Sequence, residues 1–490
     1  MLYNTAMAKN CFANFYARHR VLIMSLLNFL LWLPLLFFLW YPVGNDSGDR
    51  AHARLNLELA LRAQRICESA GCSNPFISGG ASDERLFDET EYFSAEDCVV
   101  AACLLSELRR LSEASELLDE AELKDGSDDF AAIIECQRCK IADAEISNEL
   151  RGKALGEVLH FKADIRRYFA AESLGAREGK DNNGYDLSGE LFRAEHNRGL
   201  RDCALLALAF VFVLAALLSG AYLVFKDLKG LSAWLKTGEE PPENAAKPQI
   251  PRFGYLLSFS LFVFLNWLSV FLALILGSVL NGVYHSAIIR TAELQVIIYA
   301  VNLCVIACYM PRLTACGTDS EGEQSSVSVR SVCAAIGLDG FKKSYISQAL
   351  GGYGAAVAAA ALLAEITSLI LGTAPRSANV FLNHMLNANV YEFIALFILL
   401  LIGPFYEEIF FRGLLFNGLK SFFALPLALI AASLAFGLCH GDSQGLLVLT
   451  GLGAVFAWLY QRSGSLWPPI LAHMMWNGGI AVYLFVLFHL

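Results

Sequence analysis

Long uncharged runs of apolar residues recur along the chain, with polar segments between them. The first run covers residues 21–43 and follows Lys9, Arg18 and Arg20. A helix needs about 20 apolar residues to cross the hydrocarbon core of a bilayer, so this run predicts a retained membrane anchor with its N-terminus in the cytoplasm. Further runs of similar or slightly shorter length cover residues 203–225, 255–280, 293–310, 346–372, 390–417, 424–441, 446–461 and 467–488.

These runs predict an all-α fold, a polytopic transmembrane helix bundle of about nine spans. The count is good to one or two, because the runs at 293–310 and 446–461 are short. One long polar segment is inserted between the first two spans. The predicted parts are an N-terminal membrane anchor at 1–43, an inserted helical domain at 44–200, transmembrane helices and loops at 201–344, and a last helical domain at 345–490.

The segment at residues 44–200 differs from the rest of the chain in charge and in pattern. It holds 32 Asp and Glu residues against 19 Lys and Arg residues, a net charge of −13, while the remainder of the chain carries +3. Its apolar residues recur at three- to four-residue spacing, for example Leu104, Leu108 and Leu111, which is typical of helices with one face in water. We therefore expect an acidic, extracytoplasmic helical domain, which is also a candidate surface for binding a protein partner.

Basic residues in the loops predict how the chain is oriented. With the N-terminus inside, the loops at 226–252 and 311–345 also fall inside, and they contain five and four Lys and Arg residues. The acidic segment at 44–200 then lies outside, so each of these segments agrees with the positive-inside rule. We expect a multi-pass integral protein surrounded by the lipid bilayer, in the plasma (inner) membrane if the cell is bacterial.

The composition agrees with a membrane protein and excludes some other classes. Hydrophobic residues make up 56% of the chain and charged residues 17%, against about a half and a quarter in ordinary soluble domains. The mean hydropathy is +0.47. Neither the inserted segment nor the rest carries the clustered basic stripe that nucleic-acid binding requires, so no nucleic-acid partner is expected.

Six of the 13 cysteines lie in the predicted outer domain. An even number in an oxidising compartment suggests disulfides, and the sequence leaves their pairing open. Cys136 and Cys139 could form a redox or metal pair, but their surroundings do not resemble a thioredoxin unit, so we favour structural or unpaired thiols on helices. The six residues are Cys67, Cys72, Cys98, Cys103, Cys136 and Cys139.

The C-terminal runs contain ionisable residues, which are rare inside a membrane. Placing a charge at the bilayer centre costs about 2.5–3.5 kcal/mol on insertion scales, so an acid there indicates a functional site. The first cluster is Glu407, Glu408 and Arg412. Adjacent carboxylates point about 100° apart on a helix, so Glu408 can pair with Arg412 at i,i+4 while Glu407 faces a different neighbour. An interfacial ion cluster at a helix end is the alternative for this motif taken alone.

Two further clusters each contribute a histidine. Phe436 precedes His440 by four residues, and His473 precedes Asn477 by four, a spacing that puts the imidazole and the amide on one helix face. A single histidine near a helix end is more often a cap or an interfacial residue. Two histidines on separate apolar runs, beside a Glu-Glu pair, indicate a shared site instead.

In chain order the three motifs are Glu-Glu-x-x-x-Arg, Phe-x-x-x-His and His-x-x-x-Asn. Their order and spacing resemble those of the type II CAAX prenyl endopeptidases and the related bacteriocin-processing or immunity proteins, a family of intramembrane proteases. The resemblance covers residues 345–490 and makes that part an expected intramembrane protease-like domain. It does not extend to the N-terminal two-thirds of the chain.

The resemblance implies an endopeptidase that hydrolyses a peptide bond of a membrane-associated or prenylated-type protein substrate. Glu407 and His440 would activate the attacking water. His473 and Asn477 would donate hydrogen bonds to the tetrahedral oxyanion, a contribution of about 3–4 kcal/mol for one donor in other enzymes. The identity of the substrate does not follow from these motifs.

The same resemblance gives Glu408 and Arg412 a supporting role in the site. No His-Glu-x-x-His motif is present, and we favour a metal-free mechanism without a cofactor. Two glutamates and two histidines can also compose a zinc site, so a divalent metal such as zinc stays open. Its ligands would be Glu407, Glu408, His440 and His473.

Two other functions compete with the protease. A membrane immunity or scaffold protein would keep the fold without catalysis, with the outer domain binding a partner. A proton-coupled transporter would use acids and histidines within spans as a relay. A relay has no need of His473 and Asn477 four residues apart, and the sequence shows no inverted repeats. The complete set of three motifs therefore favours the protease.

Overall fold

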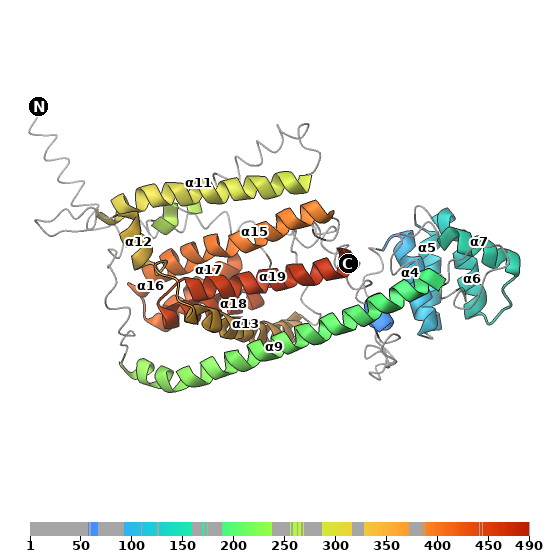
Figure 1. The fold of residues 1–490 in the computed structure, drawn as a ribbon, viewed down its shortest axis with the longest axis horizontal. Helices are drawn as coiled ribbons and strands as arrows, with labels where there is room; N and C mark the ends of the chain where they lie inside the picture. The colour runs from blue at the N-terminus through green and yellow to red at the C-terminus, as the bar shows by residue number, and fades with distance from the viewer. Residues whose placement is uncertain are drawn as a thin grey trace, which may run out of the picture. The chain divides into compact units, whose positions relative to one another are not determined.

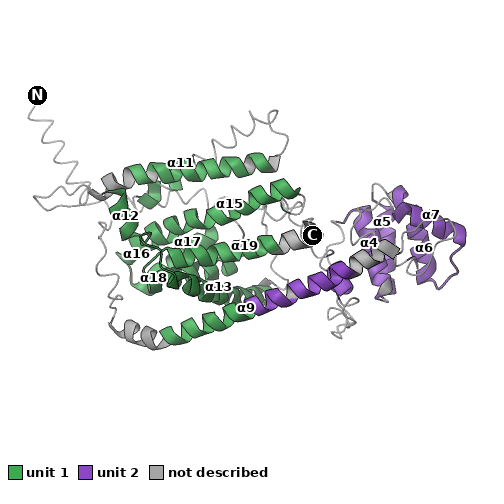
Figure 2. Ribbon diagram, in the orientation of Figure 1, with its two compact units in different colours: residues 1–44, 213–490 green, residues 45–212 purple. Residues whose placement is uncertain are grey.

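In a computed structural model of the chain, every element of the described part is a helix, which confirms the all-α class predicted from the sequence. The chain divides into two compact units, Asn45–Phe212 and the combination of Met1–Gly44 with Val213–Leu490 (Figure 2). The structure describes residues 57, 60–66, 93–108, 110–124, 127–158, 169–170, 174, 189–237, 255, 258–261, 263–265, 268, 287–315, 328–371, 385, 388–440, 442 and 444–489.

The unit Asn45–Phe212 consists of short helices around one apolar core. A capping box starts α4 (Ala95–Glu107): Ser94 Oγ accepts a hydrogen bond from Asp97 N, and Asp97 Oδ2 accepts one from Ser94 N, both at 3.1 Å. The Glu157 carboxylate accepts hydrogen bonds from Ala132 N and Ile133 N at 3.0 and 2.9 Å, which satisfies N–H groups that the start of a helix leaves free. The helices are α4 (Ala95–Glu107), α5 (Leu111–Glu122), η2 (Ser127–Phe130), α6 (Ala131–Ile141), α7 (Asn148–Val158) and the first part of α9 (Gly189–Thr237).

Cysteines contribute to the core of this unit as small apolar residues. Cys98, Cys103 and Cys136 are fully buried in it, and Cys139 is half-buried on α6. All four are free thiols, so the disulfides that the cysteine count suggested do not form among these four. Cys67 and Cys72 lie outside the described residues.

The second unit contains long apolar helices that lie nearly parallel (Figure 1). Helix α18 packs against α13 and α17, while α19 packs against α13 and α15, and α11 packs against α15. The helices are α9 from Val213 onward, α11 (Ala287–Ala315), α12 (Val329–Ala335), α13 (Ser344–Leu371), α15 (Val390–Glu408), the π-helix η5 (Ile409–Phe416), α16 (Asn417–Lys420), α17 (Leu425–Leu438), α18 (Leu446–Ser463) and α19 (Trp467–His489).

Three of the described helical stretches are long and apolar enough to cross a membrane, namely Asn197–Asp227, Ser344–Ile370 and Val390–Lys420. Shorter apolar helices cover Ala292–Val305 and Leu425–Leu438. These stretches indicate an integral membrane protein. The predicted spans at 21–43 and over most of 255–280 lie outside the described residues, so the count of nine, the orientation and the outer location of 44–200 stay predictions.

Two glycines bring α17 and α18 close together beside the predicted site. A Cβ added at Gly453 would lie 3.1 Å from Ser433 Cα and Ser433 O, and one added at Gly437 would lie 3.1 Å from Leu446 O. These distances are shorter than an ordinary van der Waals contact, so a side chain at either position would push the helices apart. The close approach keeps the backbone of α18 near the motif residues described next.

Candidate active site

The two glutamates, Glu407 and Glu408, lie at the C-terminal end of helix α15. Asn389 starts the helix with a capping box, in which its Oδ1 accepts from Glu392 N at 3.1 Å and Glu392 Oε2 accepts from Asn389 N at 2.8 Å. The helix ends at Glu408, and the chain continues directly into the π-helix η5. Short π-helical stretches inside α-helices are rare and frequently occur at functional sites, and this one contains Arg412.

Glu408 and Arg412 form a fully buried ion pair. Arg412 Nη1 donates to Glu408 Oε1 at 2.7 Å, which is the i,i+4 pair that the spacing predicts, and the Arg412 and Glu408 side chains are 2% and 0% exposed. Arg412 Nη2 donates to Gly453 O of α18 at 3.1 Å. The Arg412 guanidinium also lies 4.5 Å from the centroid of the Phe436 ring. One side chain therefore ties η5 to α17 and α18.

Glu407 faces a different environment from its neighbour, as the helical geometry predicts. Its side chain is 25% exposed, and its Oε2 lies 3.9 Å from His473 Nε2. That Oε2 atom is buried and has no hydrogen-bond partner among the described residues, and the same holds for Glu408 Oε2, whose side chain is fully buried. A buried carboxylate oxygen without a partner leaves room for a bound hydrogen-bond donor, and this is the position expected of a group that receives a proton.

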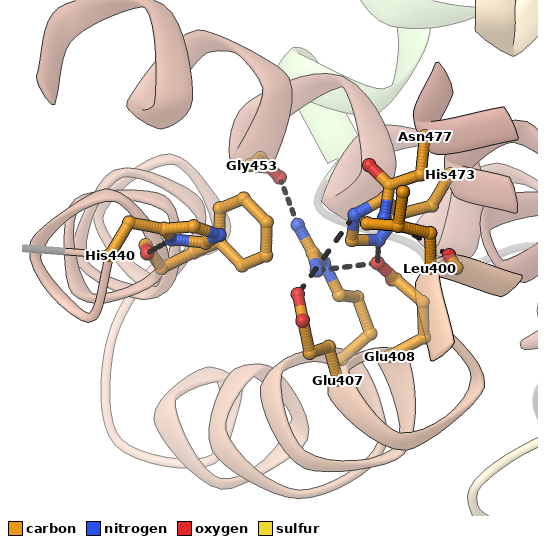
Figure 3. Close-up of polar contacts among 9 residues, drawn as sticks. Leu400, Glu407, Glu408, His440, Gly453, His473 and Asn477 are labelled. Carbon is orange, nitrogen blue, oxygen red and sulfur yellow. Dashed lines mark hydrogen bonds and ion pairs between the residues drawn. The ribbon is translucent and has the colours of Figure 1, made fainter. Parts of the chain in front are cut away.

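His473 is held between α15 and two aromatic rings. Its Nδ1 lies 2.9 Å from Glu408 Oε1, and its ring stacks on Phe456 with centroids 4.8 Å apart. Phe436 contacts the same imidazole edge-on at 5.8 Å. The contact with Glu408 fixes Nδ1 as the inner nitrogen, so Nε2 is the nitrogen on the side of Glu407 (Figure 3).

Asn477 follows His473 on α19, and Figure 3 draws the two side chains next to each other. Asn477 Nδ2 donates to Leu400 O of α15 at 3.3 Å. The amide nitrogen carries two hydrogens, so one of them is used in this contact between helices. Asn477 thus has a structural partner on α15, in addition to the oxyanion role that the family resemblance implies.

His440 lies apart from the other motif residues. It is exposed, two residues beyond the end of α17, and its Nδ1 lies 2.8 Å from Phe436 O. The Phe436 ring contacts the imidazoles of both His440 and His473, with centroid distances of 4.7 and 5.8 Å. Among the described residues, no hydrogen bond or ion pair joins His440 to Glu407. The structure therefore brings Glu407, Glu408, His473 and Asn477 together and leaves His440 in contact with one of their aromatic neighbours.

The four side chains that could compose a zinc site are only partly engaged by other groups. Glu408 Oε1 is held by Arg412 and His473, whereas the contacts of both histidines are made through Nδ1 and leave Nε2 as the nitrogen that could bind a metal. Among the described residues, no group of three or more His, Cys, Asp and Glu side chains has the arrangement of a metal site. We therefore derive no catalytic step through a metal.

The charges of the site are unequal when both glutamates are ionised. Glu407 and Glu408 face a single permanent cation, Arg412, so one negative charge is left over. A protonated His473 would balance it, since its two ring nitrogens lie toward the two carboxylates. Opposite charges attract one another strongly in an apolar surrounding, so a protonated imidazole at this position would also hold the two carboxylates in place.

Several residues of the site carry no signal in the sequence motifs. Tyr299 of α11 stacks on Tyr406 with centroids 4.1 Å apart, and Asn302 Nδ2 donates to Tyr406 Oη at 2.8 Å. A Cβ added at Gly403 would lie 3.7 Å from both Glu407 Oε1 and Tyr299 Oη. The Tyr299 hydroxyl therefore lies near the Glu407 carboxylate. Its position more than one hundred residues earlier in the chain explains why spacing arguments could not find it.

Comparisons with known proteins match the part of the chain that contains the three motifs. Residues 389–479 match the family model described as Type II CAAX prenyl endopeptidase Rce1-like. The chain is 38% identical over 82 residues to the "Putative membrane peptidase YdiL" of Bacillus subtilis, covering 17% of this chain and 34% of that protein. It is 35% identical over 96 residues to the membrane-embedded CAAX protease MroQ of Staphylococcus aureus, covering 18% of this chain and 39% of that protein.

The matched region is limited to the C-terminal part, where the resemblance to this family was expected and is now confirmed. The chain spans only about a third to two-fifths of the length of these curated relatives. No solved structure matches it significantly. The comparisons and the apolar helices indicate an integral membrane protein with a CAAX protease-like segment at residues 389–479.

Proposed function

We propose that residues 389–479, which match the Rce1-like family, form the catalytic centre of an intramembrane endopeptidase. The substrate would be a membrane-associated or prenylated-type protein, cleaved at a peptide bond by an activated water. The observation that carries this proposal is the unpartnered, buried Glu407 Oε2, 3.9 Å from His473 Nε2.

Glu407 is the proton acceptor in this mechanism. A water bound at Glu407 Oε2 adds its oxygen to the carbonyl carbon of the peptide, and its proton passes to the Glu407 carboxylate. As the carbon–nitrogen bond breaks, the same proton passes to the leaving amine, and the carboxylate is regenerated. Glu408 also has an unpartnered Oε2, but its side chain is fully buried and its Oε1 is held by Arg412 and His473, whereas the Glu407 side chain is 25% exposed and open to a water.

The negative oxygen that forms on the carbonyl needs hydrogen-bond donors. Asn477 can supply the N–H that it does not use on Leu400 O, and His473 can supply Nε2–H in its protonated form. The Nδ1 of His473 is held by Glu408, so the ring is oriented before substrate arrives. Donors that are positioned in advance stabilise a developing charge without reorganising during the reaction.

We propose that His440 helps to activate the water by accepting a hydrogen bond from it at Nε2, on the exposed side of the site. Its Nδ1–H can donate to Phe436 O, which leaves Nε2 as a free acceptor in the neutral ring. The contact of both histidines with Phe436 supports a place near the reaction centre. A movement of the exposed turn that carries His440 would bring Nε2 to the water when substrate binds.

The proposal is tested by comparing new protein N-termini in membranes that contain wild-type protein or Glu407→Gln at equal levels. We expect cleavage products that depend on Glu407. Glu392→Gln is the matched control, because it makes the same change on the same helix, and a glutamine oxygen can still accept the capping hydrogen bond from Asn389 N. A product set unaffected by Glu407→Gln would reject the protease and favour a scaffold or transporter.

A further inference from the structure

Helix α15 contains a proline one turn before the two glutamates. Pro404 has no N–H group, so it cannot donate the helical hydrogen bond that would end at Leu400 O, four residues earlier. The carbonyl of Leu400 is therefore left without its normal helical donor. In a membrane helix such a carbonyl has to be satisfied by a neighbouring helix, a side chain or a water.

Asn477 supplies the missing donor from α19. Its Nδ2 lies 3.3 Å from Leu400 O, and the partner of a carbonyl oxygen must be the amide nitrogen because the amide oxygen cannot donate. The absent N–H of Pro404 and the side chain of Asn477 thus complement each other. An alanine in place of this proline would bring its own N–H to Leu400 O and compete with Asn477.

The contact of Asn477 with Leu400 O lies about one turn of α19 from the contact of His473 with Glu408. Leu400 bonds to Asn477 and Glu408 bonds to His473, so two hydrogen bonds connect α15 with α19 in antiparallel order. Leu400 and Glu408 are about 12 Å apart along α15, and His473 and Asn477 about 6 Å apart along α19. Along α15, Glu407 lies between these two hydrogen bonds, and its Oε2 faces His473 Nε2.

We propose that Pro404 and Asn477 form one joint between α15 and α19, with Pro404 as a positioning residue that sets Glu407 opposite His473. The joint uses one amide hydrogen of Asn477 and leaves the second for the oxyanion. It deepens the proposed function in its catalytic consequence, while the pairing of Leu400 O with Asn477 holds whether or not the protein is an enzyme.

The joint is tested by a double-mutant cycle on thermal unfolding of the purified full-length protein in detergent. Asn477→Ala leaves Leu400 O unsatisfied, so we expect it to lower Tm by about 2–4 °C. In a Pro404→Ala background, the backbone N–H of the introduced alanine can donate to Leu400 O. Asn477→Ala should then change Tm by much less. An equal loss of Tm in both backgrounds would overturn the joint, because contacting residues are expected to be non-additive.

Two control variants separate the joint from general destabilisation. Asn417 Nδ2 donates to Gly413 O and Tyr460 Oη, so Asn417→Ala should lower Tm equally in the wild-type and in the Pro404→Ala background. Pro468 lies in the first turn of α19, where helices leave N–H groups free. Pro468→Ala should therefore not alter the effect of Asn477→Ala, and a change as large as that caused by Pro404→Ala would overturn the joint.

A second variant covers the case in which Pro404→Ala does not fold. Asn477→Asp keeps the shape of the side chain, but its carboxylate cannot donate to Leu400 O. It should lower Tm at least as much as Asn477→Ala does. Unchanged Tm in both of these variants would overturn the proposal without any use of Pro404.

The positioning role is tested on cleavage, once a substrate is available. Pro404→Ala should lower kcat by up to about 100-fold, the effect of a small misplacement of a catalytic group, with KM nearly unchanged. A kcat equal to that of wild type would overturn the positioning role. If the wild-type protein cleaves nothing, the proposed function fails, and the unfolding cycle still decides whether the joint exists.

Discussion

Glu408 and His473 are joined by a contact of 2.9 Å between Oε1 and Nδ1, and both side chains are almost fully buried. The contact links the first and the third sequence motif, which lie 65 residues apart. It also fixes which nitrogen of His473 is turned toward Glu407. Because a carboxylate accepts hydrogen bonds, His473 carries a hydrogen on Nδ1 and donates from Nε2 only when the ring is doubly protonated.

Removing the cation of the site should harm stability and activity together. Arg412→Ala strands Glu408 as a buried charge, a change that costs about 3–5 kcal/mol in other proteins, so we expect a lower Tm and a lower yield in membranes. Arg412→Lys keeps the charge but cannot reach Glu408 and Gly453 O with one planar group. It should have an intermediate Tm, measured in detergent beside wild type. An unchanged Tm in Arg412→Ala would contradict the importance of this ion pair.

The two histidines should respond differently to substitution. His440 is exposed, so His440→Ala should change the free energy of unfolding by no more than about 0.5 kcal/mol while strongly reducing cleavage. His473 is buried and bonded to Glu408, so His473→Ala should reduce both stability and cleavage. Unfolding curves and cleavage rates of the two variants check this contrast. Full activity of His440→Ala would remove that residue from the mechanism.

The orientation of the unit Asn45–Phe212 can be tested through its thiols. Burial raises the pKa of Cys98 to about 12 and that of Cys136 to about 11, so at pH 8 both stay protonated, and the thiolate is the form that reacts. Cys139 is half-buried and is expected to be the reactive thiol of the three. A maleimide that cannot cross membranes should label Cys139 on intact cells or spheroplasts if this unit is outside.

The control for this labelling is Cys139→Ser, in which the label at residue 139 should disappear. Labelling of Cys139 only after the membrane is made permeable would reverse the predicted topology. The measurement needs no substrate, so it tests the location of the unit independently of the protease proposal.

Much of the bundle could be predicted from the sequence because lipid and helix impose simple rules. The runs at 424–441 and 446–461 correspond to α17 (Leu425–Leu438) and α18 (Leu446–Ser463), since apolar residues bounded by Pro, Gly and polar residues have few alternatives to a helix. The pairing of Glu408 with Arg412 also followed from i,i+4 spacing.

Other features depend on packing that spacing cannot reveal. The contact of Asn477 with Leu400 O needs the relative placement of α15 and α19, so residue spacing alone gives no reason to expect a loss of stability in Asn477→Ala. With that contact known, we expect this variant to lower stability as well as turnover. The position of His440, beyond the end of α17 and bonded to Phe436 O, equally depends on where a short helix stops.

The most direct test of the central claim is the cleavage rate of purified Glu407→Gln on a substrate found in the membrane comparison. The variant is nearly isosteric but cannot accept the proton, so we expect the rate to fall by at least about 100-fold with Tm close to that of wild type. Glu392→Gln should keep the wild-type rate. Full cleavage by Glu407→Gln would contradict the proposed mechanism, and a retained biological effect with no cleavage by any variant would favour the scaffold.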